Sequence, residues 1–205
     1  MPLIKTYELN NSQINIWEVN EFHDNLDSAK KISLNYHPYI SDYKNKNKIN
    51  QILATRLLAN TLFPGHELLQ NKNGKPYLNP GNQQISLSND KSLIAMLSSN
   101  EKCGIDIQSF NSKIKNIQHK FVNNKDFSFQ GTEEELMWTW CAKESMYKVY
   151  GTPEIFFKDH LIVYLKEGNE LFGECIHDEY SYKCTLSIMR LKNNFIVYTK
   201  NIELN

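Results

Sequence analysis

The order of its periodic segments constrains this chain most, because a helical pattern followed by short strand patterns occurs twice. Isoleucines and leucines recur at four-residue steps from about Asp42 to Phe63, and Pro64-Gly65 ends this helical pattern. Three short strand segments follow, separated by turns rich in Asn, Asp and Ser, at residues 85–88, 93–98 and 103–108. This order predicts an α+β fold with antiparallel sheets.

The second half repeats the pattern. Residues 114–126 have a helical pattern, and a stronger helix is expected over residues 132–150, with a capping box at Thr132 and Glu135 and a stop at Gly151. Strands are expected in this half at residues 161–165, 170–176, 182–190 and 195–200, and near the start of the chain at residues 14–19. We therefore expect two pseudo-symmetric halves, residues 1–110 and 111–205, each a helix packed on a small antiparallel sheet, in one compact unit.

Composition excludes several classes of protein. Hydrophobic residues make up 40% of the chain, which argues against disorder, and 23 basic residues balance 23 acidic ones, which argues against a general nucleic-acid binder. No apolar run approaches the roughly 20 residues that a membrane span needs, and no signal peptide is expected. The four cysteines lack the spacing of a zinc site, so we expect buried, reduced thiols in a cytoplasmic protein. A bidentate anion clamp would have to use Arg56 or Arg190, the two arginines of the chain.

The segment Gly104-Ile105-Asp106-Ile107-Gln108 alternates as a strand does. Ile105 and Ile107 are expected to face the core, which places Asp106 and Gln108 together on the other face. Two oxygen-bearing side chains two residues apart on a strand can bind one hard cation. The alternative is an ordinary half-buried strand whose polar residues face water.

The strong helix carries a second candidate. Trp140, Glu144 and Lys148 are spaced four residues apart and so share one helix face. A carboxylate and an ammonium one turn apart could hold a metal and a phosphate together. The alternative is an exposed Glu–Lys ion pair, which stabilises a helix by only a few tenths of a kcal/mol.

Two further segments could bind an anion. In Gly74-Lys75-Pro76-Tyr77-Leu78, a turn bent by glycine and fixed by Pro76 can present amides and Lys75 to an anion. In the strand ending Ser88-Asn89, a hydroxyl and an amide are suited to phosphate oxygens. Plain turn chemistry is the alternative for both.

The order and spacing of four segments resemble the 4′-phosphopantetheinyl transferase superfamily, in its longer, monomeric form with two pseudo-symmetric halves. The four segments are GKPYL, ISLSND, GIDIQ and WCAKESMYKVYG. The matching segments span residues 74–151, and the ends of the chain match only in their element pattern. The segment ATRLLANTL, which contains Arg56, resembles the family's Arg-Leu-Leu helix that precedes these motifs. The pair Phe121 and Asp126 resembles the family's phenylalanine-to-acid motif between the two metal-binding motifs.

The resemblance implies an enzyme that transfers phosphopantetheine from coenzyme A to a serine of a carrier protein, with Mg²⁺ or Mn²⁺ as cofactor. Lys148 would contact a phosphate, and Glu144 or a metal-bound water would take the serine proton. The metal ligands that it implies are Asp106, Gln108 and Glu144. The coenzyme A contacts that it implies are Arg56, Lys75, Pro76, Ser88 and Asn89.

Two positions depart from the family pattern. Asn89 stands where the family has a histidine that contacts the 3′-phosphate, and Gln108 stands where it has a second metal-binding carboxylate. Both changes remove charge, so they predict weaker binding of coenzyme A and of metal. A second interpretation is therefore a non-catalytic relative that binds coenzyme A or a carrier protein, and a third is an unrelated α+β domain that shares short strings by chance.

The partner implied by the resemblance is an acidic acyl or peptidyl carrier protein of fatty-acid, polyketide or peptide synthesis. Docking would need a local basic surface, and solvated lysines without a partner are the alternative. The candidate lysines are Lys44, Lys46 and Lys48, or Lys113, Lys115 and Lys120. Because two halves already supply both sides of a cleft, we expect a monomer.

Overall fold

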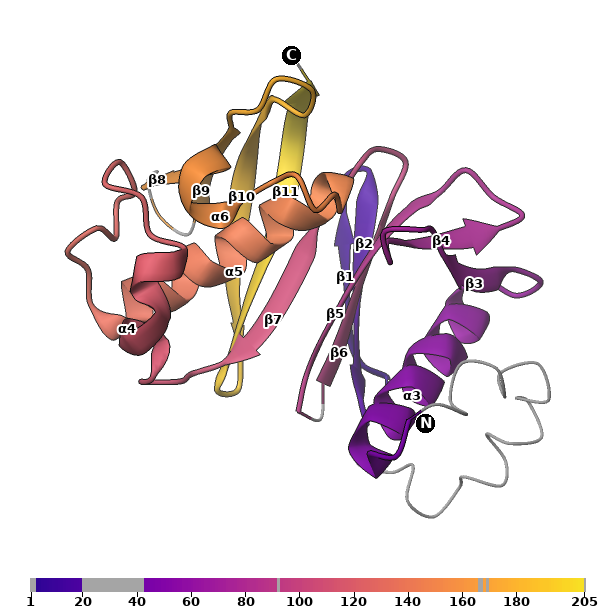
Figure 1. Ribbon diagram of the computed structural model, residues 1–205. Helices are drawn as coiled ribbons and strands as arrows, with labels where there is room; N and C mark the ends of the chain where they lie inside the picture. Colours follow the sequence, from indigo (N-terminus) through magenta and orange to yellow (C-terminus); the bar gives the residue numbers. More distant parts are fainter. Residues whose placement is uncertain (1–2, 20–42, 92, 166–167, 169, 205) are drawn as a thin grey trace.

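The computed structural model describes residues 3–19, 43–91, 93–165, 168 and 170–204, which form a mixed α+β fold with antiparallel strands (Figure 1). The strands are β1 (Leu3–Leu9), β2 (Ser12–Glu18), β3 (Glu67–Gln70), β4 (Pro76–Asn79), β5 (Gln84–Asp90), β6 (Leu93–Ser99), β7 (Ile105–Ser109), β8 (Leu161–Leu165), β9 (Glu170–Cys175), β10 (Tyr182–Leu191) and β11 (Asn194–Leu204). The helices are α3 (Lys46–Leu62), α4 (Ile114–Ile117), the 3₁₀ turn η1 (Gln118–Lys120), α5 (Glu133–Tyr150) and α6 (Phe157–His160).

Within these residues the strands form three sheets. The first has four strands in the order β1-β2-β6-β5, the second has five in the order β7-β11-β10-β9-β8, and β3 and β4 form a separate hairpin. β7 follows β6 in the chain but pairs with β11, from Ile105 opposite Tyr198 to Ser109 opposite Asn194. The chain therefore passes from the first sheet to the second between Ser99 and Ile105.

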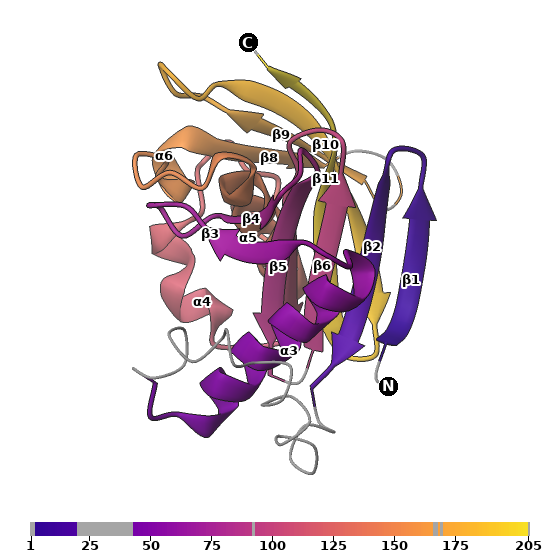
Figure 2. The ribbon, with the colours of Figure 1, turned by 90° about the vertical axis from the view of Figure 1, so that its right-hand side faces the viewer.

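Helix α3 and the β3–β4 hairpin cover the outer face of the four-stranded sheet. Ala54 and Leu58 of the helix pack with Leu68 and Leu78 of the hairpin and with Trp17 of β2, all of them buried. Figure 2 shows α3 lying across β5, β6 and β2. Burial of these apolar side chains is the main force that holds this layer together.

The inner faces of the two sheets pack against each other. One buried cluster contains residues of both sheets. Ile14 of β2 and Ala95 of β6 belong to it, together with Ile105, Ile107 and Ile196 of the second sheet. Ile105 and Ile107 face this cluster, so the intervening Asp106 points to the opposite face, where α5 lies.

Helix α5 packs on the outer face of the five-stranded sheet (Figure 1). It begins at a capping box in which Thr132 accepts from the Glu135 N–H while the Glu135 carboxylate accepts from the Thr132 N–H. It ends at Gly151, whose φ of 63° is a left-handed conformation that glycine adopts without a steric penalty. Cys141, Met146 and other apolar residues of the helix complete the largest buried cluster.

One glycine sets the distance between α5 and β7. A Cβ on Gly104 would lie 1.8 Å from the carbonyl oxygen of Ser145, so only glycine allows this approach. The Ser145 hydroxyl donates to the carbonyl of Val197 in β11, at 2.7 Å. Gly104 and Ser145 thus bring the helix face of Glu144 and Lys148 close to Asp106.

The sequence predicted several elements correctly and others wrongly. The helix at 132–150 and the strands of the second half are confirmed. The expected start of the first helix, Asp42, lies outside the described residues, and the helix begins at Lys46 because the Asn45 side chain caps it. The expected helix at 114–126 is wrong beyond Lys120. There, the Asp126 carboxylate accepts the N–H of Asn123 and stabilises a turn instead.

All four cysteines are buried free thiols, as predicted. In the part of the chain that the structure describes, no helix is long and apolar enough to cross a membrane.

Candidate active site

Asp106 lies at the centre of the site, between β5, β7 and α5. Its side chain is buried, and its Oδ1 accepts two hydrogen bonds, from the Ser88 hydroxyl at 2.7 Å and from the Lys148 ammonium at 2.8 Å. Its Oδ2 is buried and accepts no hydrogen bond from an N–H or O–H group of the described residues, while the buried Cys141 thiol of α5 interacts with the same carboxylate. A buried carboxylate oxygen without a partner is costly, so this atom is suited to a ligand that donates or carries positive charge.

Glu144 faces Asp106 from α5. Burial and the negative charge of Asp106 raise the pKa of Glu144 to about 7, against an opposing effect of Lys148. No residue in the described ranges donates a hydrogen bond to its carboxylate. Two acidic groups that repel each other in a partly buried position are the electrostatic setting of a cation site or of a general base near neutral pH.

Lys148 does not form the exposed ion pair with Glu144 that its spacing predicted as an alternative. Its ammonium binds Asp106 Oδ1 and also donates to the carbonyl of Ile105 at 2.9 Å. The side chain is 23% exposed, so it is reachable from solvent. Lys148 therefore neutralises part of the charge on Asp106 and remains close enough to the surface to meet a phosphate.

Gln108 lies on the same face of β7 as Asp106, as the strand alternation predicted. It is half-buried and lines a hollow together with Met137 and Trp140 of α5 and the exposed Lys113. Its side chain thus lies on the α5 side of β7, two residues along the strand from Asp106.

The donors are oxygen atoms of low total charge, and such donors suit a hard divalent cation. Asp106 offers an oxygen without a partner, and Glu144 offers a carboxylate with no hydrogen bond from a described residue. Gln108 lies two residues from Asp106 on β7 and lines a hollow that includes neither carboxylate. The residues that the structure describes contain no group of three His, Cys, Asp or Glu side chains that could hold a metal. The set of two carboxylates and one amide that the resemblance implies therefore stays a prediction.

The expected anion-binding residues line a groove on the other side of β5. Arg56 of α3, Pro76 of β4 and Asn89 of β5 line one hollow, together with Lys48 and Gln51. Arg56 is buried and donates to the carbonyl of Leu68 at 2.6 Å, so the guanidinium is held by the β3–β4 hairpin. An adjoining hollow shares Gly74, Pro76 and Leu87 with the first and adds Lys75 and Lys148. Arg56, Pro76 and Asn89 are thus brought together, within one groove that extends to Lys148.

Lys75 is placed at the C-terminal end of α5. Its ammonium donates to the carbonyl of Val149, and its side chain packs against Gly151. Burial lowers the pKa of Lys75. A cation at a helix C-terminus is favourable, so this contact ties the Gly74–Pro76 turn to α5.

Ser88 lies between β5 and β7 instead of facing the groove. Its Oγ accepts the N–H of Ile107 at 3.2 Å and donates to Asp106. Ser86 and Asp90 accept the N–H groups of Ile105 and Ser109 in the same way. Three alternate side chains of β5 thus take the place of a backbone ladder at the edge of β7.

Sequence reasoning missed the role of Lys143, which precedes Glu144. Its ammonium is fully buried and binds Asp126 Oδ2 at 2.6 Å and the carbonyl of Phe121 at 2.7 Å. Asp126 Oδ1 in turn accepts the N–H of Val163 in β8. The ion pair fixes α5 to the loop before it, and no local signal in the sequence distinguishes Lys143 from an exposed lysine, because Glu144 and Ser145 follow it directly.

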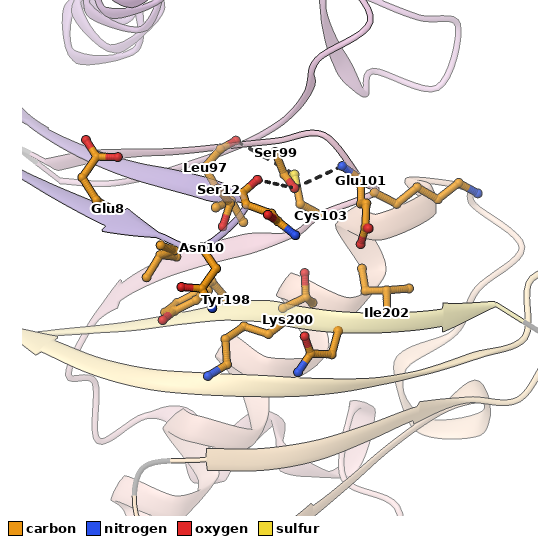
Figure 3. Close-up of a pocket in the computed structure, with 15 residues that line it drawn as sticks. Glu8, Asn10, Ser12, Leu97, Ser99, Glu101, Cys103, Tyr198, Lys200 and Ile202 are labelled. Atoms are coloured by element: carbon orange, nitrogen blue, oxygen red, sulfur yellow. Dashed lines mark hydrogen bonds between the residues drawn. The ribbon is translucent and has the colours of Figure 1, made fainter.

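A further hollow lies at the junction of the two sheets, away from these residues. It is lined by the β1–β2 turn, the β6–β7 connection and the end of β11, and Figure 3 shows Ser12, Glu101 and Lys200 among its polar side chains. It contains none of the expected site residues.

The chain matches no protein-family model, and it matches none of the curated proteins with which it was compared.

Proposed function

We propose that this protein transfers the 4′-phosphopantetheine group from coenzyme A to a serine of an acyl or peptidyl carrier protein. The observation that carries the proposal is the convergence of Asp106, Glu144 and Lys148, in which a buried carboxylate oxygen has no partner and a neighbouring carboxyl has its pKa raised to about 7. The order of the four sequence motifs adds the expectation of this chemistry.

The proposed reaction breaks one phosphorus–oxygen bond and forms another. The serine oxygen bonds to the phosphorus next to pantetheine, the bond to the bridging oxygen breaks, and adenosine 3′,5′-bisphosphate leaves with that oxygen. A divalent cation bound by Asp106, Glu144 and the Gln108 amide would neutralise charge on the pyrophosphate.

The residues of the chain have separate tasks in this proposal. Glu144, with a pKa near neutral, can accept the proton of the serine hydroxyl. Lys148 can donate to a phosphate oxygen from the position where it now neutralises Asp106. Arg56 and Lys48 bring positive charge to the groove in which the bisphosphate end would lie, with Pro76 and Asn89 beside it.

The finer expectations belong to the same proposal. The helix-bearing four-stranded and five-stranded sheets would be the two pseudo-symmetric halves of a monomeric cytoplasmic enzyme. The lysines of both alternative docking surfaces for an acidic carrier protein are exposed: Lys44, Lys46 and Lys48, or Lys113, Lys115 and Lys120. Lys113 is the one that lines the hollow beside Gln108, so docking there would bring a carrier close to the cation site.

The test is a mass measurement on a carrier protein. The purified chain, an apo-carrier, coenzyme A and Mg²⁺ should yield carrier increased by the mass of phosphopantetheine. Asp106→Asn and Glu144→Gln should abolish the gain while the unfolding midpoint shows that the variants fold. Retained transfer by both folded variants would contradict the assigned site.

A non-catalytic function is favoured by specific residues. Gln108 and Asn89 lack the charges expected in an efficient enzyme, and Lys75 is held on the Val149 carbonyl. A relative that only binds coenzyme A or a carrier would show saturable binding of coenzyme A by calorimetry with no mass gain under any carrier tested.

A further inference from the structure

The two oxygens of the Asp106 carboxylate have different surroundings. Oδ1 accepts both available hydrogen bonds, from Ser88 and Lys148, and Oδ2 accepts none. Since the side chain is 2% exposed, contact with bulk solvent does not explain the difference. The two hydrogen bonds to Oδ1 keep the carboxylate in the orientation in which the buried Oδ2 accepts no N–H or O–H group.

We propose that Ser88 is a positioning residue for a divalent cation, because its hydroxyl holds Asp106 by Oδ1 and so presents Oδ2 to the metal. This assignment rests on the proposed function, and it moves Ser88 out of the coenzyme A contacts that the sequence resemblance implied for it.

The hydrogen-bond capacity of serine favours this role. A hydroxyl has one proton to donate, and the Ser88 proton is directed to Asp106 while its lone pair accepts the Ile107 N–H. A phosphate of coenzyme A would need that same proton. Donation to a phosphate would therefore leave a buried carboxylate oxygen with one hydrogen bond fewer.

The fold supplies a matched control. Ser86 lies two residues earlier on β5 and accepts the Ile105 N–H at 3.0 Å, but it has no hydrogen bond to Asp106. Replacing either serine with alanine leaves one N–H of β7 without its acceptor. Only the Ser88 replacement also removes the donor to the carboxylate.

The experiment measures two affinities on the folded, metal-free protein: that of Mn²⁺, from the paramagnetic resonance signal of the free ion, and that of adenosine 3′,5′-bisphosphate, by calorimetry. Ser88→Ala should weaken Mn²⁺ binding by about 10- to 100-fold, as is typical when a partner of a metal ligand is lost. Its bisphosphate affinity should stay at the value of the parent. Ser86→Ala should keep the Mn²⁺ affinity of the parent, and Ser88→Thr, which retains the hydroxyl, should recover most of it.

Three results would overturn the proposal. Loss of bisphosphate affinity with unchanged Mn²⁺ affinity in Ser88→Ala would return Ser88 to the coenzyme A site. An equal loss of Mn²⁺ affinity in Ser86→Ala and Ser88→Ala would show a general loosening of the β5–β7 contact. A parent that binds no Mn²⁺ would remove the cation site itself, and with it the proposed function. If Ser88→Ala does not fold, Ser88→Cys, a weaker donor of similar shape, takes its place in the same comparison.

Discussion

At the scale of single residues, Lys148 neutralises the Asp106 carboxylate, as a bound divalent cation could also do. Its ammonium lies 2.8 Å from Asp106 Oδ1, so a divalent cation on the same carboxylate would experience repulsion from it. Lys148→Met, which keeps the apolar stem, should therefore bind Mn²⁺ more tightly than the parent. Turnover should nevertheless fall by about 100-fold or more, because the donor to the transferring phosphate is lost.

Opposite changes in binding and turnover distinguish this role from a structural one. Lys183→Met is a suitable control, since Lys183 forms only a distant pair with Glu174 on the surface of β10. It removes the same charge and should change neither quantity. Weaker Mn²⁺ binding in Lys148→Met would mean that Lys148 organises the site instead of competing with the cation.

Glu144 makes the stability of the metal-free protein depend on pH. Its pKa is about 7 in the folded protein and near 4.5 in an ordinary setting, so between these values the folded state binds more protons than the unfolded state. Stability is therefore largest below about pH 4.5 for this group and falls as pH rises through 7, by up to about 3 kcal/mol. Glu144→Gln should remove this fall. Urea unfolding of both proteins in EDTA at pH 5 and pH 8 measures it, and equal pH dependence in the two would contradict the assignment.

Strand alternation was sufficient to predict that Asp106 and Gln108 share a face. It could not predict which partners they meet, because the i, i+4 rule considers only neighbours on one helix. Lys148 pairs across 42 residues with Asp106 instead of with Glu144, and Ser88 meets Asp106 through the packing of two sheets. The Lys148 contact depends on how close Gly104 allows α5 to approach, a distance that no local pattern encodes.

At the scale of secondary-structure elements, the Lys143–Asp126 pair fixes α5 to the loop at 121–132 and to β8. Both side chains are fully buried, so removing one charge leaves the other without compensation. Lys143→Met should destabilise the protein by about 3–5 kcal/mol. The double variant Lys143→Met with Asp126→Asn should recover part of this loss, since no buried charge then remains.

Chemical denaturation of the parent, the single variant and the double variant measures these free energies. A Lys143→Met variant as stable as the parent would show that the pair contributes little.

The same pair explains why the sequence overestimated the helix at 114–126: Asp126 serves as an acceptor for Asn123, Val163 and Lys143, which a helical position would not allow. The helix at 132–150 was predictable because its capping box and its terminal glycine are local signals.

At the scale of the whole molecule, β7 connects the two sheets in an unusual way. By sequence it follows β6, and the expected boundary after residue 110 would place it in the first half, yet its backbone pairs with β11 of the second sheet. Its other edge is held by the side chains of Ser86, Ser88 and Asp90 from the first. The proposed cation site lies at this junction, so its geometry depends on both sheets at once.

This arrangement predicts that the two sheets unfold together. Trp17 of β2 is buried against α3, whereas Trp138 and Trp140 of α5 pack on the buried cluster of the five-stranded sheet. Tryptophan fluorescence can therefore report on each sheet separately. In a Trp138→Phe, Trp140→Phe variant, the fluorescence of Trp17 should change at the same urea concentration as the circular dichroism of the whole chain. In Trp17→Phe, the fluorescence of Trp138 and Trp140 should likewise coincide with the dichroism. A Trp17 transition at lower urea than the dichroism would show that the four-stranded sheet unfolds alone. The site at the β5–β7 junction would then lose its geometry before the second sheet unfolds. A rigid site at this junction therefore requires that the two sheets unfold as one cooperative unit.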